Sequence, residues 1–378
     1  MKFSLESSKW EHEPIYACSK NKFVTSSKWN KQKEAENMKM IKTTEAVGNV
    51  LCHDITQIIK GVSKGVAFRK GHIIKEEDVP VLLSLGKDNI YIWEKNEKMM
   101  HENEAADVLF KICKGKNISG TEVKEGKVEL ISEVDGILQV DVERLNKINS
   151  LGEIIVSTRH RNFPVKKGDK LAGTKVIPLV IEKEKMKKAE KIASDRPLLN
   201  VIEFSKKKVG IVTTGNEIFH GRIKDAFGPV IIEKLSEYEV EVLGQEIVND
   251  NLENITGAID KFLKMDVDMI ICTGGMSVDP DDLTPSAIKR TGAEIVSYGA
   301  PVFPGAMFLL AYYNDNIPIV GLPGCVMYSK RTIFDLVLPR MMADIKLYDK
   351  DLIEMGHGGL CLSCNVCTFP NCGFGKGM

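Results

Sequence analysis

Short apolar segments alternate with helix-period segments along residues 201–347. The apolar segments are rich in β-branched residues, whereas Ile255, Ile259 and Phe262 recur on one face of a helix. This alternation predicts an α/β domain of three α/β/α layers with a mostly parallel sheet, whose strands present ligand sites at their carboxyl ends. The expected strands are 209–212, 241–248, 268–272 and 317–320, and the expected helices are 230–238, 252–264 and 285–290.

Two helix starts in this domain carry capping signals. Asp250 and Glu253 have the spacing of a capping box before the second expected helix. Thr284 is the expected cap of the third helix.

The pattern before residue 201 predicts smaller units. Residues 41–94 form a compact segment with a short helix that begins at an Asp78 cap and ends at Gly86. An α+β domain follows, and residues 182–196 form a charged helical connector. The α+β domain has expected helices at 102–114 and 142–148, and expected strands at 127–131, 137–140, 154–157 and 174–181.

The chain is therefore expected to have five parts. They are a polar, loosely ordered extension (1–37), a small N-terminal segment (38–96), an α+β domain with its connector (97–200), the α/β domain (201–347) and a Cys-rich tail (348–378).

Composition narrows the function to small-molecule chemistry. Lys plus Arg and Asp plus Glu number 52 each in 378 residues, so the net charge does not favour nucleic acid or a membrane surface. No run of about 18 apolar residues and no signal peptide is present, so we expect a cytoplasmic protein. The nine cysteines lack the even framework of a secreted disulfide protein, which agrees with this location.

Two strands of the α/β domain run into glycine turns. Thr213, Thr214 and Gly215 follow the first, and Thr273, Gly274 and Gly275 follow the third. Glycine allows a tight turn and close approach of a ligand, and the following helix adds partial positive charge, so phosphate is the expected guest. The alternative is that these residues only connect strand to helix.

Acidic residues accompany the second turn. Asp279, Asp281 and Asp282 fall within four positions, and carboxylates beside a phosphate site commonly hold Mg²⁺. Three acids cannot all be well solvated there, so one of them is expected to be spare.

Four motifs of this domain, in order and spacing, resemble the molybdenum-cofactor biosynthesis (molybdopterin-binding) domain of molybdopterin adenylyltransferases and molybdenumtransferases. They are Gly210-Ile-Val-Thr-Thr-Gly-Asn-Glu-Ile218, Thr273-Gly-Gly-Met-Ser-Val278 with Asp282-Leu-Thr-Pro285, Phe303-Pro-Gly305 and Gly321-Leu-Pro-Gly324. The resemblance covers about residues 206–345.

The resemblance implies binding of molybdopterin, a pterin phosphate, with nucleotide, molybdate or tungstate as further partners and Mg²⁺ as cofactor. Asp282 and Glu217 are the implied catalytic residues, with Asp282 also the metal ligand. The implied ligand-binding residues are Thr213, Thr214, Gly215, Thr273, Gly274, Gly275, Ser277, Asp279, Thr284, Pro304, Gly305, Pro323 and Gly324.

One departure bears on activity. Residues 38–96 share Ala46-Val-Gly-Asn-Val-Leu51 with molybdenumtransferases, but 54–70 show only Lys64-Gly-Val-Ala-Phe68 where that family has a Met-Asp-Gly-Tyr-type loop. The acid expected for molybdate insertion is missing. A non-catalytic carrier or sensor, or a nucleotide pyrophosphatase on the same domain, therefore stays open beside a transferase, as do the choice of metal and a homo-oligomeric state.

The tail contains Cys361-x-x-Cys364-x-x-Cys367-x4-Cys372. Thiolates at this spacing chelate Zn²⁺ or an iron–sulfur cluster, and the alternatives are a redox dithiol or a flexible oxidised tail. We expect the tail to contribute little apolar surface to the main fold. The lone His53 and His72 are expected to be surface or satisfied residues.

Overall fold

A computed structural model describes residues 38–59, 63–93 and 98–377, so the extension 1–37 lies outside the described residues. The chain divides into two compact units, Met1–Met99 and Met100–Met378, each described below by itself. Over the described ranges, no helix is both long and apolar enough to cross a membrane.

The first unit is a small sheet with one helix. A three-stranded sheet has the order β1-β5-β2, and β3 and β4 form a separate hairpin. The elements are β1 (Met38–Lys42), the 3-10 helix η1 (Thr43–Glu45), β2 (Val50–Leu51), β3 (Ile55–Ile59), β4 (Ser63–Phe68), α2 (Asp78–Ser84) and β5 (Asn89–Trp93). Their core contains Ala46, Leu51, Ile55, Ile74, Leu82, Ile90 and Ile92.

Asp78 does not cap α2 as expected. It is the first helical residue, and the helix has no side-chain cap. The Asp78 carboxylate instead accepts the Lys75 N–H at 2.8 Å and contacts His72 Nε2 at 2.6 Å. His72 is thus a satisfied residue of this small unit.

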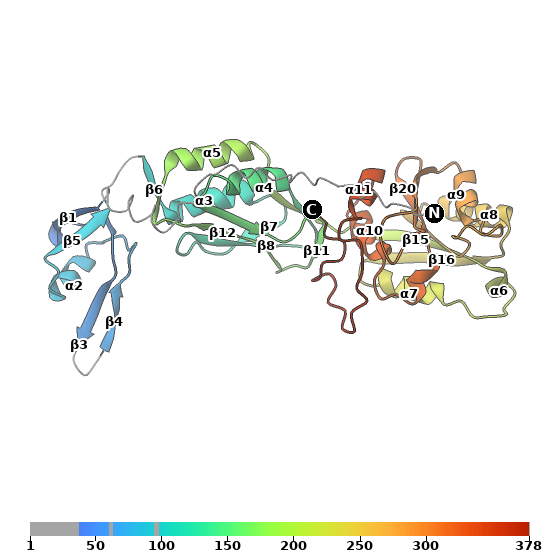
Figure 1. The fold of residues 1–378 in the computed structure, drawn as a ribbon, viewed down its shortest axis with the longest axis horizontal. Coiled ribbons are helices and arrows are strands. Elements are labelled where there is room, and N and C mark those ends of the chain that lie inside the picture. The colour runs from blue at the N-terminus through green and yellow to red at the C-terminus, as the bar shows by residue number, and fades with distance from the viewer. Residues whose placement is uncertain (1–37, 60–62, 94–97, 378) are drawn as a thin grey trace, which may run out of the picture. The chain divides into compact units, whose positions relative to one another are not determined.

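The next part of the chain is α+β, as expected, with three small sheets and three helices. Helices α3 and α4 pack on the four-stranded sheet, and α5 packs on both helices (Figure 1). The elements are β6 (Met99–His101), α3 (Glu102–Cys113), β7 (Ile118–Gly120), β8 (Lys127–Ser132), β9 (Gly136–Val140), α4 (Val142–Asn149), β10 (Ile154–Thr158), β11 (Phe163–Val165), β12 (Lys170–Val176), β13 (Val180–Glu182), α5 (Lys183–Ala193) and β14 (Leu199–Glu203).

Three details differ from the expectation. The single strand expected at 174–181 is two strands, β12 and β13, separated around Pro178. The connector helix α5 buries Met186, Ala189 and Ala193, so it belongs to the core. Strand β14 pairs with β9 across the boundary that we expected at residue 201.

The α/β class and the largely parallel sheet of the following domain are confirmed. Its six-stranded sheet has the order β16-β15-β17-β20-β19-β18, parallel from β16 to β20 and antiparallel beyond. The strands are β15 (Lys207–Thr214), β16 (Val240–Val248), β17 (Met269–Thr273), β18 (Glu294–Tyr298), β19 (Leu309–Tyr313) and β20 (Ile317–Leu322). The helices are α6 (Asn216–Phe219), α7 (Phe227–Leu235), α8 (Leu252–Leu263), α9 (Thr284–Arg290), the 3-10 helix η2 (Gly324–Met327), α10 (Ile333–Met342) and α11 (Asp349–Glu354).

Alternate side chains of this sheet enter two different hydrophobic cores. Val209 and Ile211 of β15 pack in one core with residues of α7 and α10, while Val212 packs in another with residues of α8 and α9. Figure 1 shows α7 on one side of β15 and β16, and α8 and α9 on the other. This two-sided burial explains why these strands are continuous apolar runs.

Both expected helix caps are wrong. Asn251 caps α8, since its side chain accepts the N–H groups of Glu253 and Asn254. Helix α9 starts at Thr284 without a side-chain cap, because the Thr284 hydroxyl donates to the carbonyl of Gly274 at 2.8 Å. Asp250 and Thr284 both bond to loops at the sheet edge, which local spacing does not reveal.

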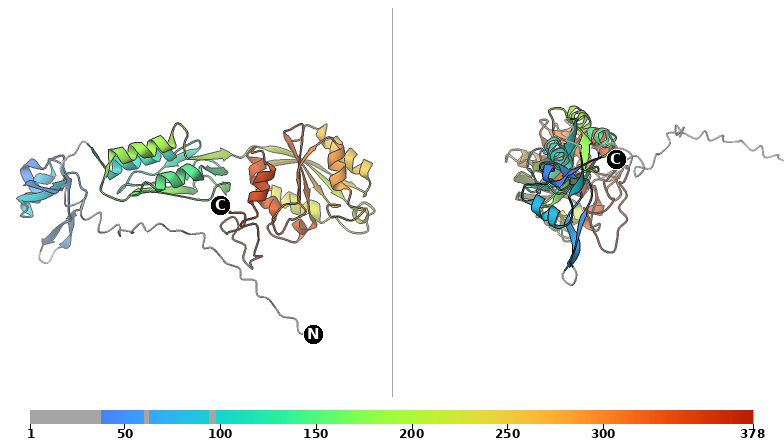
Figure 2. Two further views of the ribbon diagram at one scale, coloured as in Figure 1. Left: turned by 45° about the horizontal axis from the view of Figure 1, so that its top comes forward. Right: turned by 90° about the vertical axis from the view of Figure 1, so that its left-hand side faces the viewer.

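The tail is packed against the α/β domain, contrary to the expectation that it adds little apolar surface. Phe374 is 5% exposed and belongs to the same core as α7 and α10, and Phe369 packs against that core. Figure 2 shows the segment as an irregular loop beside the red helices. Removing it would uncover core residues.

We expect Phe374→Ala to lower the free energy of unfolding by about 3 kcal/mol, because it removes a buried ring and leaves a cavity. Val366→Ala is the matched control in the same segment, since Val366 is 77% exposed and should change stability by under about 0.5 kcal/mol. Urea unfolding of the full chain measures both. Equal stability of the two variants would contradict the packed tail.

Candidate functional site

The register of β15 and β17 brings the two predicted glycine turns together. Thr213 pairs with Thr273 at the carboxyl ends of the parallel strands. The Thr273 hydroxyl donates to the Thr213 hydroxyl at 3.2 Å, and Gln245 of β16 donates to the same oxygen at 2.8 Å. Both threonines are fully buried, so they fix the ends of the strands relative to each other.

The glycines of the second turn lie against the first turn. Gly274 has a φ of +83°, and a Cβ there would collide with the carbonyl oxygen of Thr214. At Gly275 a Cβ would lie 2.9 Å from the Thr284 hydroxyl oxygen, so the missing side chain makes room for packing between the loops. Packing between the two turns is therefore one reason for these glycines, and their part in a phosphate site stays a prediction.

A cavity of about 800 Å³ opens at this sheet edge. Most of the residues that the motifs implied line it: Thr214, Gly215, Glu217, Gly274, Gly275, Ser277, Asp282, Pro304, Gly305, Pro323 and Gly324. Four others lie outside the lining: Thr213, Thr273, Asp279 and Thr284. The three threonines of this second group are buried structural residues.

The two turns differ in the N–H groups that they offer. Gly215 donates its N–H to the carbonyl of Val248 at 3.2 Å, and Asn216 donates to the Asp250 carboxylate at 2.8 Å. Within the described ranges, by contrast, the N–H groups of Gly274, Gly275, Met276 and Ser277 donate to no other protein group. Of the two turns, the loop 274–277 is therefore the one that has backbone donors left for an anion.

Tyr298 of β18 supports this loop from behind. Its hydroxyl lies 3.1 Å from the carbonyl oxygens of both Met276 and Ser277, to which it donates. Burial raises the pKa of Tyr298, and the charge of Asp282 raises it further. The raised pKa favours the neutral phenol, which is the form that donates these hydrogen bonds.

Four carboxylates line the cavity, those of Glu217, Asp250, Asp281 and Asp282. One oxygen of Asp282 accepts the N–H of Asp279 at 3.2 Å, and the Asp282 N–H donates to the Asp279 carbonyl at 2.9 Å. This turn holds Asp282 at the cavity. Asp250 was missed as a site residue, because its position before a helix suggested a cap.

Among the described residues, no three His, Cys, Asp or Glu side chains converge to hold a metal ion. The donor set still suits Mg²⁺, since this ion typically takes one or two protein carboxylates and completes its shell with water and substrate phosphates. Asp282, half-buried at the cavity with one oxygen unbonded, is such a donor.

The Cys-rich tail supplies part of the cavity wall. Phe303 donates its N–H to the carbonyl of Gly359 and accepts the N–H of Cys361, each at 2.8 Å. Leu360 and Cys361 consequently line the cavity beside the Phe303–Met307 loop and Cys325. Burial raises the pKa of the Cys325 thiol. Sequence spacing gave no signal for this pairing of tail and loop.

Residues 210–343 match the family described as "Probable molybdopterin binding domain". The family resemblance of this domain is confirmed. Residues 40–94 match a separate family described as a domain of unknown function, DUF8806. The likeness of the N-terminal segment to molybdenumtransferases stays a prediction.

Curated relatives match over parts of the chain. A CinA-like protein of Mycobacterium avium (strain 104) is 36% identical over 90 residues, which are 24% of this chain and 21% of that protein. A molybdopterin molybdenumtransferase of Synechococcus elongatus is 26% identical over 149 residues, 37% of each chain. The chain thus spans about a fifth to two fifths of the length of these relatives.

Solved structures show a similar partial match. The tungsten cofactor synthesizing protein MoaB from Pyrococcus furiosus aligns with a TM-score of 0.28 and 20% identity over 37% of this chain and 90% of its own. The CinA protein from Thermoplasma acidophilum aligns with a TM-score of 0.30 and 18% identity over 36% of this chain and 98% of its own.

We expect Gly274→Ala to destabilise the α/β domain by about 2 kcal/mol or more. Alanine is strained at the positive φ of this position, and its Cβ would collide with the backbone of Thr214. Gly324→Ala is the control, since its Cβ would meet nothing within 4 Å. Denaturant midpoints of the two variants test this. A Gly274→Ala variant as stable as Gly324→Ala would show that the turns are not packed together.

Proposed function

We propose that the 201–347 domain, with its three-layer α/β/α arrangement, binds molybdopterin and acts in the assembly of the molybdenum or tungsten cofactor. The observation that supports this most is the single cavity shared by all four motif loops. Its volume of about 800 Å³ lies within the usual range of about 300–1,000 Å³ for small-molecule sites. The cytoplasmic location expected from the sequence stays a prediction.

The phosphate of the pterin belongs at loop 274–277. Its unpaired N–H groups can donate to a phosphate without breaking hydrogen bonds within the protein. Unlike carboxylates, they do not repel the phosphate charge. The bound phosphate would lie close to Asp282 and Asp281, which line the same cavity. A cation is required between phosphate and carboxylate to offset their repulsion.

Asp282 would hold Mg²⁺ at this position, with phosphate oxygens and water as its other ligands. The ion would supply neutralisation of the charge that develops when a phosphoanhydride is formed or broken. The protein's own contribution is positioning: the Asp279–Asp282 turn fixes the carboxylate, and Tyr298 fixes the loop that faces the phosphate. Glu217 lines the opposite loop and is the second proposed catalytic carboxylate.

The chain is an enzyme only if the bound pterin or nucleotide reacts in the cavity. The absence of a Met-Asp-Gly-Tyr-type loop in 54–70 favours a carrier or sensor over molybdate insertion. Anaerobic incubation of the purified chain with adenylylated pterin, with molybdate or tungstate, and separately with plain dinucleotides separates the alternatives. Product only from the dinucleotides indicates a pyrophosphatase, and binding without product indicates a carrier.

Gly324→Leu should weaken molybdopterin binding at least about tenfold, because a side chain at this cavity position has open space and would occupy ligand volume. Gly257→Leu is the control: this exposed residue of α8 also has nothing within 4 Å and lies outside the cavity lining. Pterin released from an anaerobic molybdenum enzyme is the probe, with retention measured by fluorescence after oxidation. Equal retention by both variants would place the ligand elsewhere.

Asp282→Asn should keep pterin affinity within a few fold and lower Mg²⁺-dependent turnover by about two orders of magnitude, because the amide keeps the shape and loses the charge. Asp279→Asn is the matched control, since its side chain lies in the same turn but outside the lining. Affinity and turnover are measured on one preparation. Unchanged turnover in Asp282→Asn would remove this carboxylate from the mechanism, and a parallel fall of both would make it a pterin contact.

A further inference from the structure

The four tail cysteines line one cavity. Cys361, Cys364, Cys367 and Cys372 all line a cavity of about 770 Å³ on the α/β domain, and each is a free thiol. Cys364 and Cys367 are exposed, whereas Cys361 and Cys372 are half-buried against the core. Four thiols that line one cavity indicate a metal site more specifically than their spacing in the sequence does.

The segment is held at its two ends and exposed between them. Cys361 is fixed by its hydrogen bond to Phe303, and at the other end Phe374 is buried while the Gly375 N–H donates to the Gly358 carbonyl at 2.9 Å. Residues 362–368 between these ends are exposed and form neither helix nor strand. Cys364 and Cys367 can therefore approach the other two thiols without disrupting the core.

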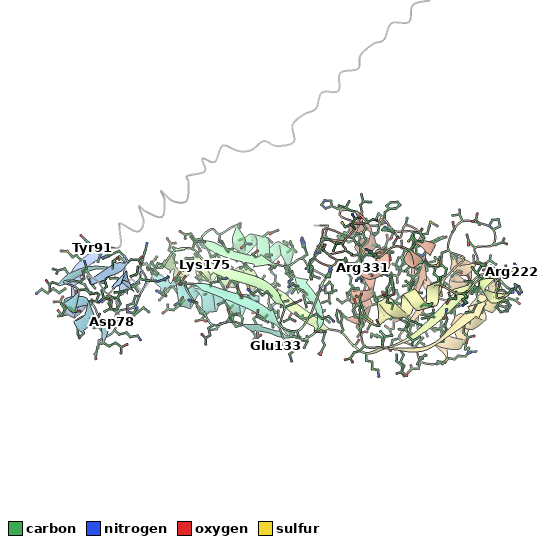
Figure 3. All side chains as sticks on the ribbon, turned by 90° about the horizontal axis from the view of Figure 1, so that it is seen from below. Asp78, Tyr91, Glu133, Lys175, Arg222 and Arg331 are labelled. Carbon is green, nitrogen blue, oxygen red and sulfur yellow. The ribbon has the colours of Figure 1, made fainter. Side chains whose placement is uncertain are left out.

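Two basic residues line the cavity that contains the thiols. Lys330 and Arg331 line the same cavity, and Lys330 Nζ donates to the Asn365 carbonyl at 3.2 Å. The Arg331 guanidinium carbon lies 4.9 Å from the centre of the Phe369 ring, and Figure 3 labels this side chain on the α/β domain. Four thiolates around a divalent ion carry a net negative charge, which Lys330 complements, whereas Arg331 is already paired with Glu237 and Asp335.

Cys361 also lines the ligand cavity described above, as do Leu360, Tyr328 and Ser329. The two hollows thus share one wall. One backbone hydrogen bond joins Cys361 to Phe303, and a second joins Phe303 to Gly359.

We propose that Cys361, Cys364, Cys367 and Cys372 bind one thiophilic metal centre, zinc or an iron–sulfur cluster, and that this centre forms a wall of the ligand cavity. In the described residues no three such side chains yet converge, so binding must draw Cys364 and Cys367 inward. Metal loading would then restrain Cys361 and the loop that contains Phe303. The metal site stands independently of the proposed function, whereas its effect on molybdopterin binding rests on that function.

Metal binding is tested on the full chain in two arms. One is anaerobic titration with zinc, and the other is reconstitution with ferrous iron and sulfide, followed by metal and sulfide analysis. We expect one centre per chain, at least about tenfold weaker binding in Cys364→Ser and in Cys367→Ser, and no change in Val366→Ala, which keeps all four thiols. Absence of a centre in both arms, a disulfide formed in its place, or unaltered binding by the serine variants would overturn the site.

The shared wall is tested without any pterin. Amide hydrogen exchange should slow at least about threefold at residues 303–307 and 359–361 when metal is added to the wild type and to Val366→Ala, and should not change in Cys364→Ser. Unchanged exchange at these residues in the metal-loaded wild type would contradict the proposal that the metal centre forms part of the cavity wall. Failure of molybdopterin to bind, with metal-dependent protection intact, would count against the proposed function alone.

Discussion

The parallel register of β15 with β17 is the constraint on which the site depends. Because Thr213 lies opposite Thr273, both strands end at the same level, and their turns must share one small volume. Only a residue without a side chain fits where Gly274 meets Thr214. The Thr284 hydroxyl then closes the arrangement by donating to the Gly274 carbonyl. A slip of one residue in this pairing would move every alternating side chain of β17 to the wrong core.

A buried ion pair fixes the second half of the site. Asp335 of α10 accepts Lys234 Nζ of α7 at 2.9 Å, and also accepts Arg331 Nη1 and the Thr332 N–H, each at 2.8 Å. Asp335 is 6% exposed and Lys234 8%, so the pair is buried, and Arg331 is a second cation for the same carboxylate. The same lysine donates to the Lys330 carbonyl at 3.0 Å, which joins the segment before α10 to α7. In this segment, Tyr328 and Ser329 line both cavities, and Lys330 and Arg331 line the cavity of the tail cysteines.

Much of the α/β domain could be predicted from sequence, because its parallel strands are buried on both faces and appear as apolar runs. Strands β18 and β19 were missed because Glu294–Tyr298 is mixed in polarity and Leu309–Tyr313 follows a proline-glycine loop that gives no strand signal.

The motif residues that line the cavity were predictable as a set. Their individual roles were not, since Thr213, Thr273 and Thr284 share the motifs yet are buried supports. Asp250 and the docked tail were missed for one reason: their partners, Asn216 and Phe303, are distant in the sequence.

The division of roles between the two turns limits how the site can operate. In the first turn, backbone donors are already used by Val248 and Asp250, so it offers side chains, namely Thr214 and Glu217. In the second turn the donors of 274–277 are unused and the loop is held from behind by Tyr298. A phosphate bound there gains hydrogen bonds without displacing any, whereas a phosphate at the first turn would have to compete with Asp250, whose charge repels it. The proposed pterin phosphate would accordingly face 274–277 with its anionic end, and the remaining cavity, bounded by Phe303 and Cys361, would take its ring portion.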